Sequence, residues 1–400
     1  MAPPRQTTTR ISLYYFLFYS TIAVWAPYFA LYLHHRGLHS STIGWILAIY
    51  PAAGLLFQPV WGILNDRFHR EWLTVVSAII LAPMAAWLFT RVSLVWYPLV
   101  AAAMATFQTA IAPVADSMTV GWLGAQRYGE ARLFGSLGYA LIVAVAGFLY
   151  HVYGIGHFLA FYLLASVLAM IGGFQYPRPR RQAMASSVRR PPWYAGVGAL
   201  LAQPKFRVIL FFSLFVTMSQ SINGSYFSLF YRATHHPLSW LGILFGIGAL
   251  SEIPVFYLSG RLIARYGAAR MLWLSGSIFA FRWMMVAFNP PTWGLVLLQC
   301  LHGPSFGLGL ASGINLASEV SQSANRVSAQ SLYSATTTGM APLFGSIFGG
   351  YVFGWVGPQN LYWVDFAVAA FGVAGIAHWV LKREGLQQGG SRIRQDSTSG

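Results

Sequence analysis

The chain has 400 residues, of which 56% are apolar, 16% aromatic and only 8% charged, and its mean hydropathy is +0.55. Soluble domains of this length carry far more charge, so the composition excludes that class and predicts an integral membrane protein. The net charge of +16 is of the sign that nucleic acids attract, but its distribution, described below, argues against a nucleic-acid partner.

Twelve apolar stretches, each long enough to cross a bilayer as a helix, follow one another along the chain. The expected fold class is therefore an all-α polytopic membrane protein with 12 transmembrane helices. The first stretch is too long for a signal-peptide core, so we expect it to remain as a helix. The predicted spans are 11–33, 43–64, 72–90, 94–122, 129–152 and 157–175 in the first half, and 207–231, 239–260, 271–289, 293–316, 328–352 and 360–381 in the second.

The positive charges lie mainly on one side of the predicted membrane. Of the 25 Lys and Arg residues, only Arg36, Arg91 and Arg232 fall in connections on the opposite side, while Arg132 and Arg282 lie within spans. Because positively charged connections stay in the cytoplasm, the sequence predicts a multi-pass protein of the plasma membrane (a cell inner membrane) with both termini cytoplasmic.

One long polar connection, 176–206, divides the chain into an N-terminal six-helix bundle (1–175) and a C-terminal six-helix bundle (207–400). This cytoplasmic linker is rich in Arg and Pro, and the two ends, Met1–Arg10 and Gln387–Gly400, are expected to be disordered tails. Residues also recur at a constant offset of 198, which predicts two duplicated halves related as a parallel repeat. Among the recurring pairs are Tyr28 and Tyr226, Gly44 and Gly242, Gly62 and Gly260, and Arg67 and Arg265.

The connection after the second predicted span carries a motif that recurs in the second half. The two copies read Gly62-Ile-Leu-Asn-Asp66-Arg67-Phe-His69-Arg70 and Gly260-Arg-Leu-Ile-Ala-Arg265-Tyr-Gly-Ala-Ala-Arg270. Both resemble the cytoplasmic signature Gly-x-Leu-x-Asp-Arg-x-Gly-Arg of the major facilitator superfamily, with His69 in place of the second Gly in the first copy. Asp66 can cap a helix start and pair with a nearby Arg, so Asp66, Arg67 and Arg265 are candidates for a conformational latch that breaks when the halves rock. A solvated turn with ordinary topogenic charge is the alternative.

Ionisable residues inside the spans are the first candidates for function, because charge is costly there. On the fifth predicted span Arg132 and Tyr139 share one helical face, where a guanidinium can bind a solute oxygen and a phenol can stack beside it. Asp116 ends the preceding span and can meet Arg132 across a short connection. Asp116 and Arg132 either belong to a substrate-binding face or form an ion pair that only holds the two helices together.

Glu252 lies about halfway along the eighth span, with no Lys or Arg within a helical turn. It must be protonated or find a cation on another helix, and a proton carrier needs that choice to depend on conformation. Arg282 and His302 lie near the middle of the next two spans, and Pro304 weakens the helix beside His302, as expected where a broken helix lines a cavity. A hydrogen-bonded core histidine is the alternative. Asp365, near the outer end of the last span, is expected to act at the membrane rim.

These positions resemble the oligosaccharide:proton symporters, the group of lactose permease, and still more the phenylpropionate-permease-like transporters. The segments Ala-Pro-Val-Ala-Asp116 and Ala131-Arg132-Leu-Phe-Gly135 match motifs of that group. The resemblance implies substrate binding by Asp116, Arg132, Tyr139 and Glu252.

The same resemblance implies proton coupling by Glu252, Arg282 and His302. The sequence departs from the symporters at Ser305, which replaces their proton-accepting Glu, and at Gln299, which replaces a Lys. If this chain carries protons, Glu252 must therefore carry them, with Asp116 as a lesser candidate.

The predicted function is import of a small organic solute, such as a sugar, nucleoside or aromatic acid, coupled to protons through alternating access. The expected partners are the solute, protons and the lipid bilayer, and we expect a monomer without cofactor or metal. An efflux transporter of drugs or metabolites is the alternative, which is disfavoured because the fifth span lacks the Gly-x-x-x-Gly-Pro signature of drug antiporters. A membrane enzyme is a third class, but the sequence holds no catalytic motif, so no catalytic residue is predicted.

Overall fold

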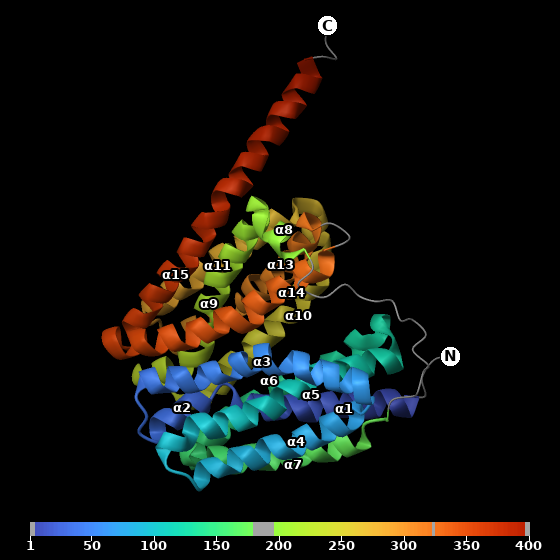
Figure 1. Cartoon of the computed structure of the whole chain (residues 1–400). Coiled ribbons are helices and arrows are strands. Elements are labelled where there is room, and N and C mark those ends of the chain that lie inside the picture. The colour runs from blue at the N-terminus through green and yellow to red at the C-terminus, as the bar shows by residue number, and fades with distance from the viewer. Residues whose placement is uncertain (1–4, 179–195, 322–324, 397–400) are drawn as a thin grey trace.

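The computed structural model describes residues 5–178, 196–321 and 325–396, with the backbone alone for residues 5, 125–126 and 378–396. In these ranges all regular secondary structure is helical. Figure 1 shows two groups of helices that lie close together at one end and diverge toward the end that holds the N-terminus.

The first group contains α1 (Arg5–Trp25), α2 (Phe29–His35), α3 (Ser40–Phe68), α4 (Glu71–Trp87), α5 (Tyr97–Leu123), α6 (Ala125–Tyr153) and α7 (Phe158–Gln175). The second contains α8 (Val197–Ala202), α9 (Pro204–Ala233), α10 (Leu241–Tyr266), α11 (Ala268–Ala287), α12 (Thr292–Cys300), α13 (Leu308–Val320), α14 (Arg326–Ser334) and α15 (Ala341–Asp396). The short helix α8 lies within the expected linker, and residues 179–195 of that linker fall outside the described ranges.

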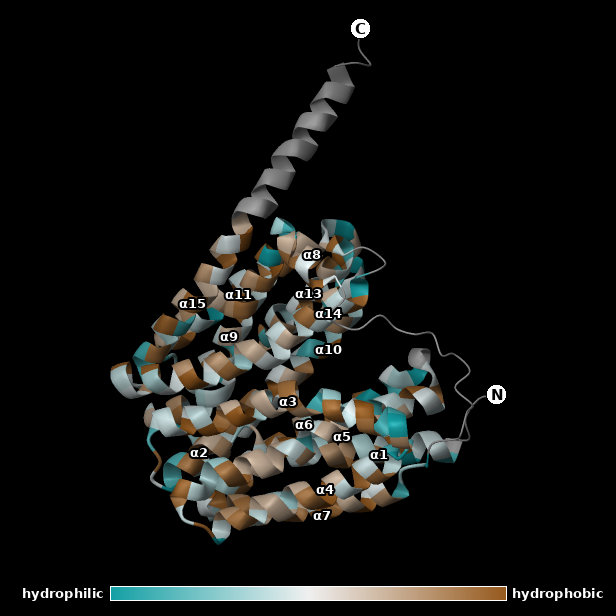
Figure 2. Ribbon diagram, viewed as in Figure 1, coloured by the Kyte–Doolittle hydropathy of each residue, from teal (hydrophilic) through white to brown (hydrophobic). Residues whose placement is uncertain are grey.

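The outer surface of the molecule suits a lipid environment. In the described ranges, ten helical segments are long and apolar enough to cross a membrane. Hydrophobic residues predominate along the outer helices α4 and α7 (Figure 2), where Met84 is 58% and Leu164 is 60% exposed. Such exposure is unfavourable in water but neutral in hydrocarbon, so these helices face the lipid.

Several predicted spans are interrupted. Residues 26–28 separate α1 from α2 at Pro27, which has no backbone N–H to continue the helical ladder. A π-helical turn, Gly303–Gly307, lies between α12 and α13, which confirms the weakened helix expected at Pro304. A second π-helical turn, Ala335–Met340, precedes α15.

The described part of each end is helical, at positions where the sequence predicts tails. Helix α1 begins at Arg5, and α15 continues to Asp396. The residues after Ala377 include the helix formers Leu, Lys, Arg, Glu and Gln and no proline, and they also include Gly385, Gly389 and Gly390, which favour a helix less. Within α15 the helical geometry breaks once, at Gly357 (φ 81°, ψ 173°).

The two groups touch through two equivalent glycine contacts at the end away from the N-terminus. Gly242 of α10 lies against the Val143 carbonyl of α6, and Tyr28 donates a hydrogen bond to that carbonyl at 2.9 Å. Gly44 of α3 lies against the Ser346 carbonyl of α15, and Tyr226 donates to it at 2.8 Å. A Cβ at either glycine would overlap the facing backbone. The pairs Tyr28/Tyr226 and Gly44/Gly242 thus do the same task in each half, as the offset of 198 predicts.

The two copies of the loop motif show why glycine is needed in only one of them. His69, the C-cap of α3, has φ 51° and ψ 46°, a left-handed conformation that non-glycine residues can adopt. Its counterpart Gly267, between α10 and α11, has φ 85° and ψ 147°, a region open essentially to glycine alone.

We predict that Gly267→His lowers the thermal unfolding midpoint of the detergent-purified protein by about 2 to 6 °C, because it forces a side chain into that region. The matched exchange His69→Gly should leave the midpoint unchanged or raise it slightly. Equal losses in the two variants would contradict this assignment of strain.

Candidate substrate and coupling site

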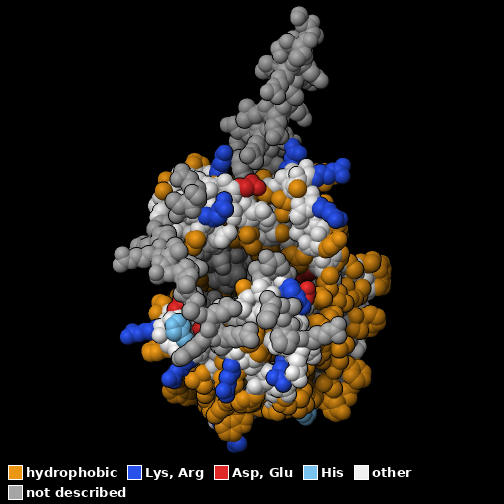
Figure 3. Space-filling model, turned by 90° about the vertical axis from the view of Figure 1, so that its right-hand side faces the viewer, with side chains coloured by type: hydrophobic (Ala, Val, Ile, Leu, Met, Phe, Trp, Pro, Cys, Tyr) orange, Lys and Arg blue, Asp and Glu red, His pale blue; other side chains and the backbone are white. Residues whose placement is uncertain are grey.

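A central cavity of about 440 Å³ lies between the two groups of helices. Figure 3 shows the molecule hollowed between the groups on the face where the N-terminus lies, with Lys and Arg side chains around the hollow. The cavity's polar lining residues are Tyr19, Arg132, Ser136 and Tyr139 from the first group and Gln220, Asn223, Glu252, Gln299 and His302 from the second.

Four residues predicted from the sequence therefore meet at one cavity. Arg132 and Tyr139 come from α6, Glu252 comes from α10, and His302 lies in the break between α12 and α13. Helices far apart in the chain supply these groups, so a solute bound here contacts both halves of the molecule at once.

Arg132 is held by an aromatic ring. Its Cζ lies 4.0 Å from the centroid of Tyr19 on α1, within cation–π range. Gly135, one turn further along α6, leaves room for that ring, because a Cβ there would come within 2.7 Å of Tyr19. The Tyr19 face thus orients the guanidinium while leaving its N–H groups available to a solute oxygen.

Asp116 and Arg132, both within the described residues, do not form the ion pair that the sequence suggests. Asp116 instead accepts a hydrogen bond from Tyr15 at 2.6 Å, and the Tyr15 hydroxyl also lies 3.0 Å from Thr119. Tyr128, which sequence reasoning missed, interacts electrostatically with both Asp116 and Arg132. Asp116 does not line the central cavity.

Glu252 and His302 are in direct contact at the cavity wall. The Glu252 Oε1 lies 3.2 Å from the His302 Nε2, and the two side chains are 24% and 21% exposed. On its other side, the His302 Nδ1 lies 3.3 Å from an Arg282 nitrogen. Since a guanidinium can only donate, Nδ1 accepts, and the neutral imidazole then carries its proton on Nε2 and donates it to Glu252.

Arg282 lies behind the cavity wall and is only 2% exposed. It donates to the Leu298 carbonyl at 3.1 Å, to Ser305 Oγ at 2.9 Å and to Gln299 Oε1 at 3.1 Å. Ser305 and Gln299 are the two positions where the sequence departs from the symporters it resembles. In this chain both of them serve as neutral acceptors for a buried guanidinium.

The expectation that Asp365 acts at the membrane rim is wrong. Its side chain is fully buried, and neither carboxylate oxygen has a hydrogen-bond partner among the described residues. The chain turns at Gly357, so the following arm of α15 runs back along α9 and α11 and carries Asp365 into the interior. Asp365 interacts electrostatically with Arg282 and with Tyr362 one turn earlier. Asp365 is the only acidic residue in the last predicted span, and a lone acid inside a span is the feature of the sequence that indicates a buried role.

The predicted latch residues are not joined in this conformation. Asp66 forms no ion pair with the described basic side chains, and α4 begins after Arg70 without a side-chain cap. Arg67 lies over Phe68, with 5.6 Å from its Cζ to the ring centroid. Arg265 lies over the ring of its own neighbour in the same way, at 5.2 Å.

A comparison with known protein families matches residues 8–364 to the MFS_1 like family. The chain belongs to this family. It is 30% identical over 349 residues to a maltose permease of Geobacillus stearothermophilus, covering 86% of this chain and 87% of the permease. It is 24% identical over 380 residues to a probable 3-phenylpropionic acid transporter of Escherichia coli (strain K12), covering 91% of this chain and 96% of that protein.

Among solved structures, a nucleoside transporter, NupG, has the same fold, with a TM-score of 0.81 at 16% identity over 92% of this chain and 98% of that one. The protein is thus a multi-pass membrane transporter of small solutes that belongs to the major facilitator superfamily, and its relatives are permeases and transporters rather than enzymes.

We predict that Arg132→Lys weakens solute binding by about tenfold or more, because an ammonium on a flexible stem can neither stack on Tyr19 nor offer a planar fork. The measurement is a thermal-shift titration of purified protein with sugars, nucleosides and aromatic acids. Arg127→Lys is the matched control on the same helix, since Arg127 only pairs with exposed Glu130 at 3.1 Å. Equal affinity in wild type and Arg132→Lys would leave Arg132 with a structural role.

Proposed function

We propose that the protein is a proton-coupled importer of a small organic solute that works by alternating access. The observation that carries the proposal is the shared cavity, where Arg132 and Tyr139 from one half face Glu252 and His302 from the other. A solute bound between them links the movements of the halves, and a proton on the Glu252 carboxylate changes the contacts that hold the site together.

We further propose that the chain makes twelve crossings, eleven of them by the ten apolar segments and one by α11. The segment 326–377 has 52 residues, about twice the length that one crossing needs, and Gly357 divides it into two arms. Helix α11, with 20 residues and buried Arg282, supplies the other crossing. The chain then has a six-helix half at 1–175, a cytoplasmic linker at 176–206 and a six-helix half at 207–400, in a monomer with cytoplasmic termini.

The conformation described here corresponds, in this proposal, to the state open to the cytoplasm. The glycine contacts at Gly44 and Gly242 close the outer end, while the latch residues Asp66, Arg67 and Arg265 are apart at the inner end. In the opposite state the inner ends meet and the latch forms, and the outer glycine contacts separate.

Proton coupling in this proposal begins at Glu252. Protonating the carboxylate weakens its bond to His302, and a freed imidazole no longer has to accept from Arg282. Asp365 is a buried carboxylate that interacts electrostatically with Arg282, so a change in the contacts of the guanidinium also affects Asp365. Arg282 is therefore linked through His302 to Glu252 at the cavity wall, and it interacts directly with Asp365 in the interior.

The maltose permease and the probable 3-phenylpropionic acid transporter support a sugar or an aromatic acid as the solute. The efflux alternative shares this site geometry, so the direction of transport is decided by experiment. Accumulation of solute inside cells under an inward proton gradient supports import, and depletion supports efflux.

We predict that Glu252→Gln keeps solute exchange across the membrane but loses accumulation, because glutamine imitates a carboxyl group that never releases its proton. The assay is uptake and counterflow in proteoliposomes with an imposed proton gradient. Glu130→Gln, at an exposed ion pair on α6, is the control that should accumulate normally.

If Glu252→Gln still concentrates its solute, the carrier lies elsewhere, and Asp365→Asn is the next variant to test. If wild-type uptake ignores the proton gradient, the protein is a facilitator and the coupling proposal is wrong.

The proposed orientation predicts the accessibility of introduced cysteines in a Cys300→Ser background. A cysteine at Ser93, exposed between α4 and α5, should react with an impermeant thiol reagent added to intact cells. A cysteine at Tyr266, the last residue of α10 and on the proposed cytoplasmic side, should react only after the cells are opened. The reverse labelling pattern would show that the termini lie outside.

A further inference from the structure

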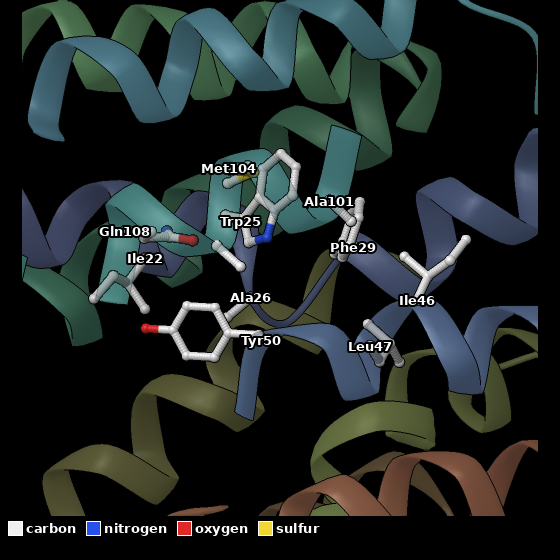
Figure 4. Close-up of a pocket in the computed structure, with 11 residues that line it drawn as sticks. Ile22, Trp25, Ala26, Phe29, Ile46, Leu47, Tyr50, Ala101, Met104 and Gln108 are labelled. Atoms are coloured by element: carbon white, nitrogen blue, oxygen red, sulfur yellow. The ribbon is translucent and has the colours of Figure 1, made fainter. Parts of the chain in front are cut away.

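A second cavity, of about 210 Å³, lies inside the first group of helices between α1, α3 and α5 (Figure 4). We call it the side chamber. Its walls are mainly apolar and aromatic, with Trp25 at the end of α1, Phe29 at the start of α2, Tyr50 on α3 and Met104 on α5. An apolar cavity of about 150 Å³ is enough to hold a benzene molecule, so the side chamber has room for a phenyl ring and part of a chain.

The side chamber adjoins the central cavity. Ile22 and Ala26 line both spaces, and Tyr19, one turn before Ile22, holds Arg132 in the central cavity. One face of α1 therefore runs from the guanidinium to the chamber. A solute with its polar end at Arg132 needs only to extend along that face to place its other end among the aromatic side chains.

The side chamber also holds polar groups that the protein itself leaves unused. Gln108 is only 8% exposed, and its amide points toward the chamber (Figure 4), yet it has no hydrogen-bond partner among the described residues. The indole N–H of Trp25, 7% exposed, and the Tyr50 hydroxyl at the chamber wall are likewise without a described partner. A buried amide without a partner is costly unless water or a ligand fills the space. The face of an aromatic ring can accept a weak hydrogen bond from the Gln108 amide or the Trp25 N–H, so these groups are compatible with a ligand that carries a ring.

We propose that the side chamber binds the apolar group of the transported solute while Arg132 binds its acidic group. The inference rests on the proposed transport function and narrows the substrate class to amphiphilic organic acids that carry a ring. A disaccharide presents hydroxyl groups on every side, and three polar groups in an apolar chamber cannot satisfy them.

The test uses purified full-length protein and calorimetric titration with 3-phenylpropionate, propionate and maltose. Wild type should bind 3-phenylpropionate roughly a hundredfold more tightly than propionate, since burying a phenyl group contributes a few kcal/mol in apolar surroundings. Arg132→Lys should weaken the binding of both acids. Maltose binding in preference to 3-phenylpropionate would overturn the inference and leave the transport function intact.

Variants of the chamber wall separate the two proposals. Ala101→Phe fills the side chamber and should remove most of the advantage of 3-phenylpropionate over propionate. Leu99→Phe, on the same helix but 61% exposed, is the control that should bind as wild type does. Met104→Ala enlarges the chamber and should shift the preference toward 3-(2-naphthyl)propionate, which keeps the test open if Ala101→Phe does not fold.

Unchanged selectivity in folded Ala101→Phe and in Met104→Ala would overturn the side-chamber assignment. A different result would contradict the proposed transport function itself: wild-type proteoliposomes would exchange none of the three solutes, and Arg132→Lys would not change the binding of any of them.

Discussion

Hydrocarbon offers no hydrogen bonds, and this constraint organises the whole molecule. Each backbone amide in the membrane has to be satisfied within its own segment, which leaves the helix as the practical choice for a chain of this composition. The same constraint acts on side chains, because a charge inside the membrane needs a partner. Arg282 shows the result, with four hydrogen-bonding neighbours gathered around one buried guanidinium.

The constraint also explains where the regular helix gives way. The π-helical turn at Gly303–Gly307 frees backbone groups beside the cavity, and Ser305 and Gly303 both find partners there: Ser305 Oγ donates to the Leu301 carbonyl at 2.8 Å, and the Gly303 N–H donates to Ser251 Oγ at 2.8 Å. Because Gly303 has no side chain, α10 can approach until its backbone touches the turn. This contact fixes His302 opposite Glu252, so an irregular backbone segment creates the coupling pair.

Much of the fold could be predicted from the sequence, because the helices follow from the composition and the two halves from the repeat. Apolar stretches predict helices directly, and the offset of 198 paired Tyr28 with Tyr226 and Gly44 with Gly242 before their shared role was visible. The convergence of Arg132, Glu252 and His302 on one cavity followed from the cost of intramembrane charge and from the family resemblance. These are properties of single residues or of a regular pattern, which a sequence carries explicitly.

The partners of those residues were harder to predict, because they depend on helix rotation and on where helices end. The short connection between α5 and α6 suggested an Asp116–Arg132 pair, but the actual rotation of α1 places Tyr15 against Asp116 and Tyr19 against Arg132. Asp365 was misplaced because hydropathy gives a residue's distance along a span and not the face that it occupies. Gln108 escaped notice for a similar reason, since a neutral amide in an apolar helix shows its significance only when the side chamber beside it is seen.

The replacement of two charged residues by Ser305 and Gln299 changes what can balance Arg282. Neutral acceptors satisfy the hydrogen bonds of a guanidinium but leave its charge uncompensated, and charge in a medium of low dielectric is the larger cost. A chain that has serine at position 305 therefore gains from a carboxylate elsewhere, and Asp365 is buried and interacts electrostatically with the same guanidinium. Arg282 can then be balanced either from Glu252 through His302 or from Asp365. An equilibrium between two such arrangements, sensitive to which acid holds a proton, is the kind of bistable element that a coupled transporter requires.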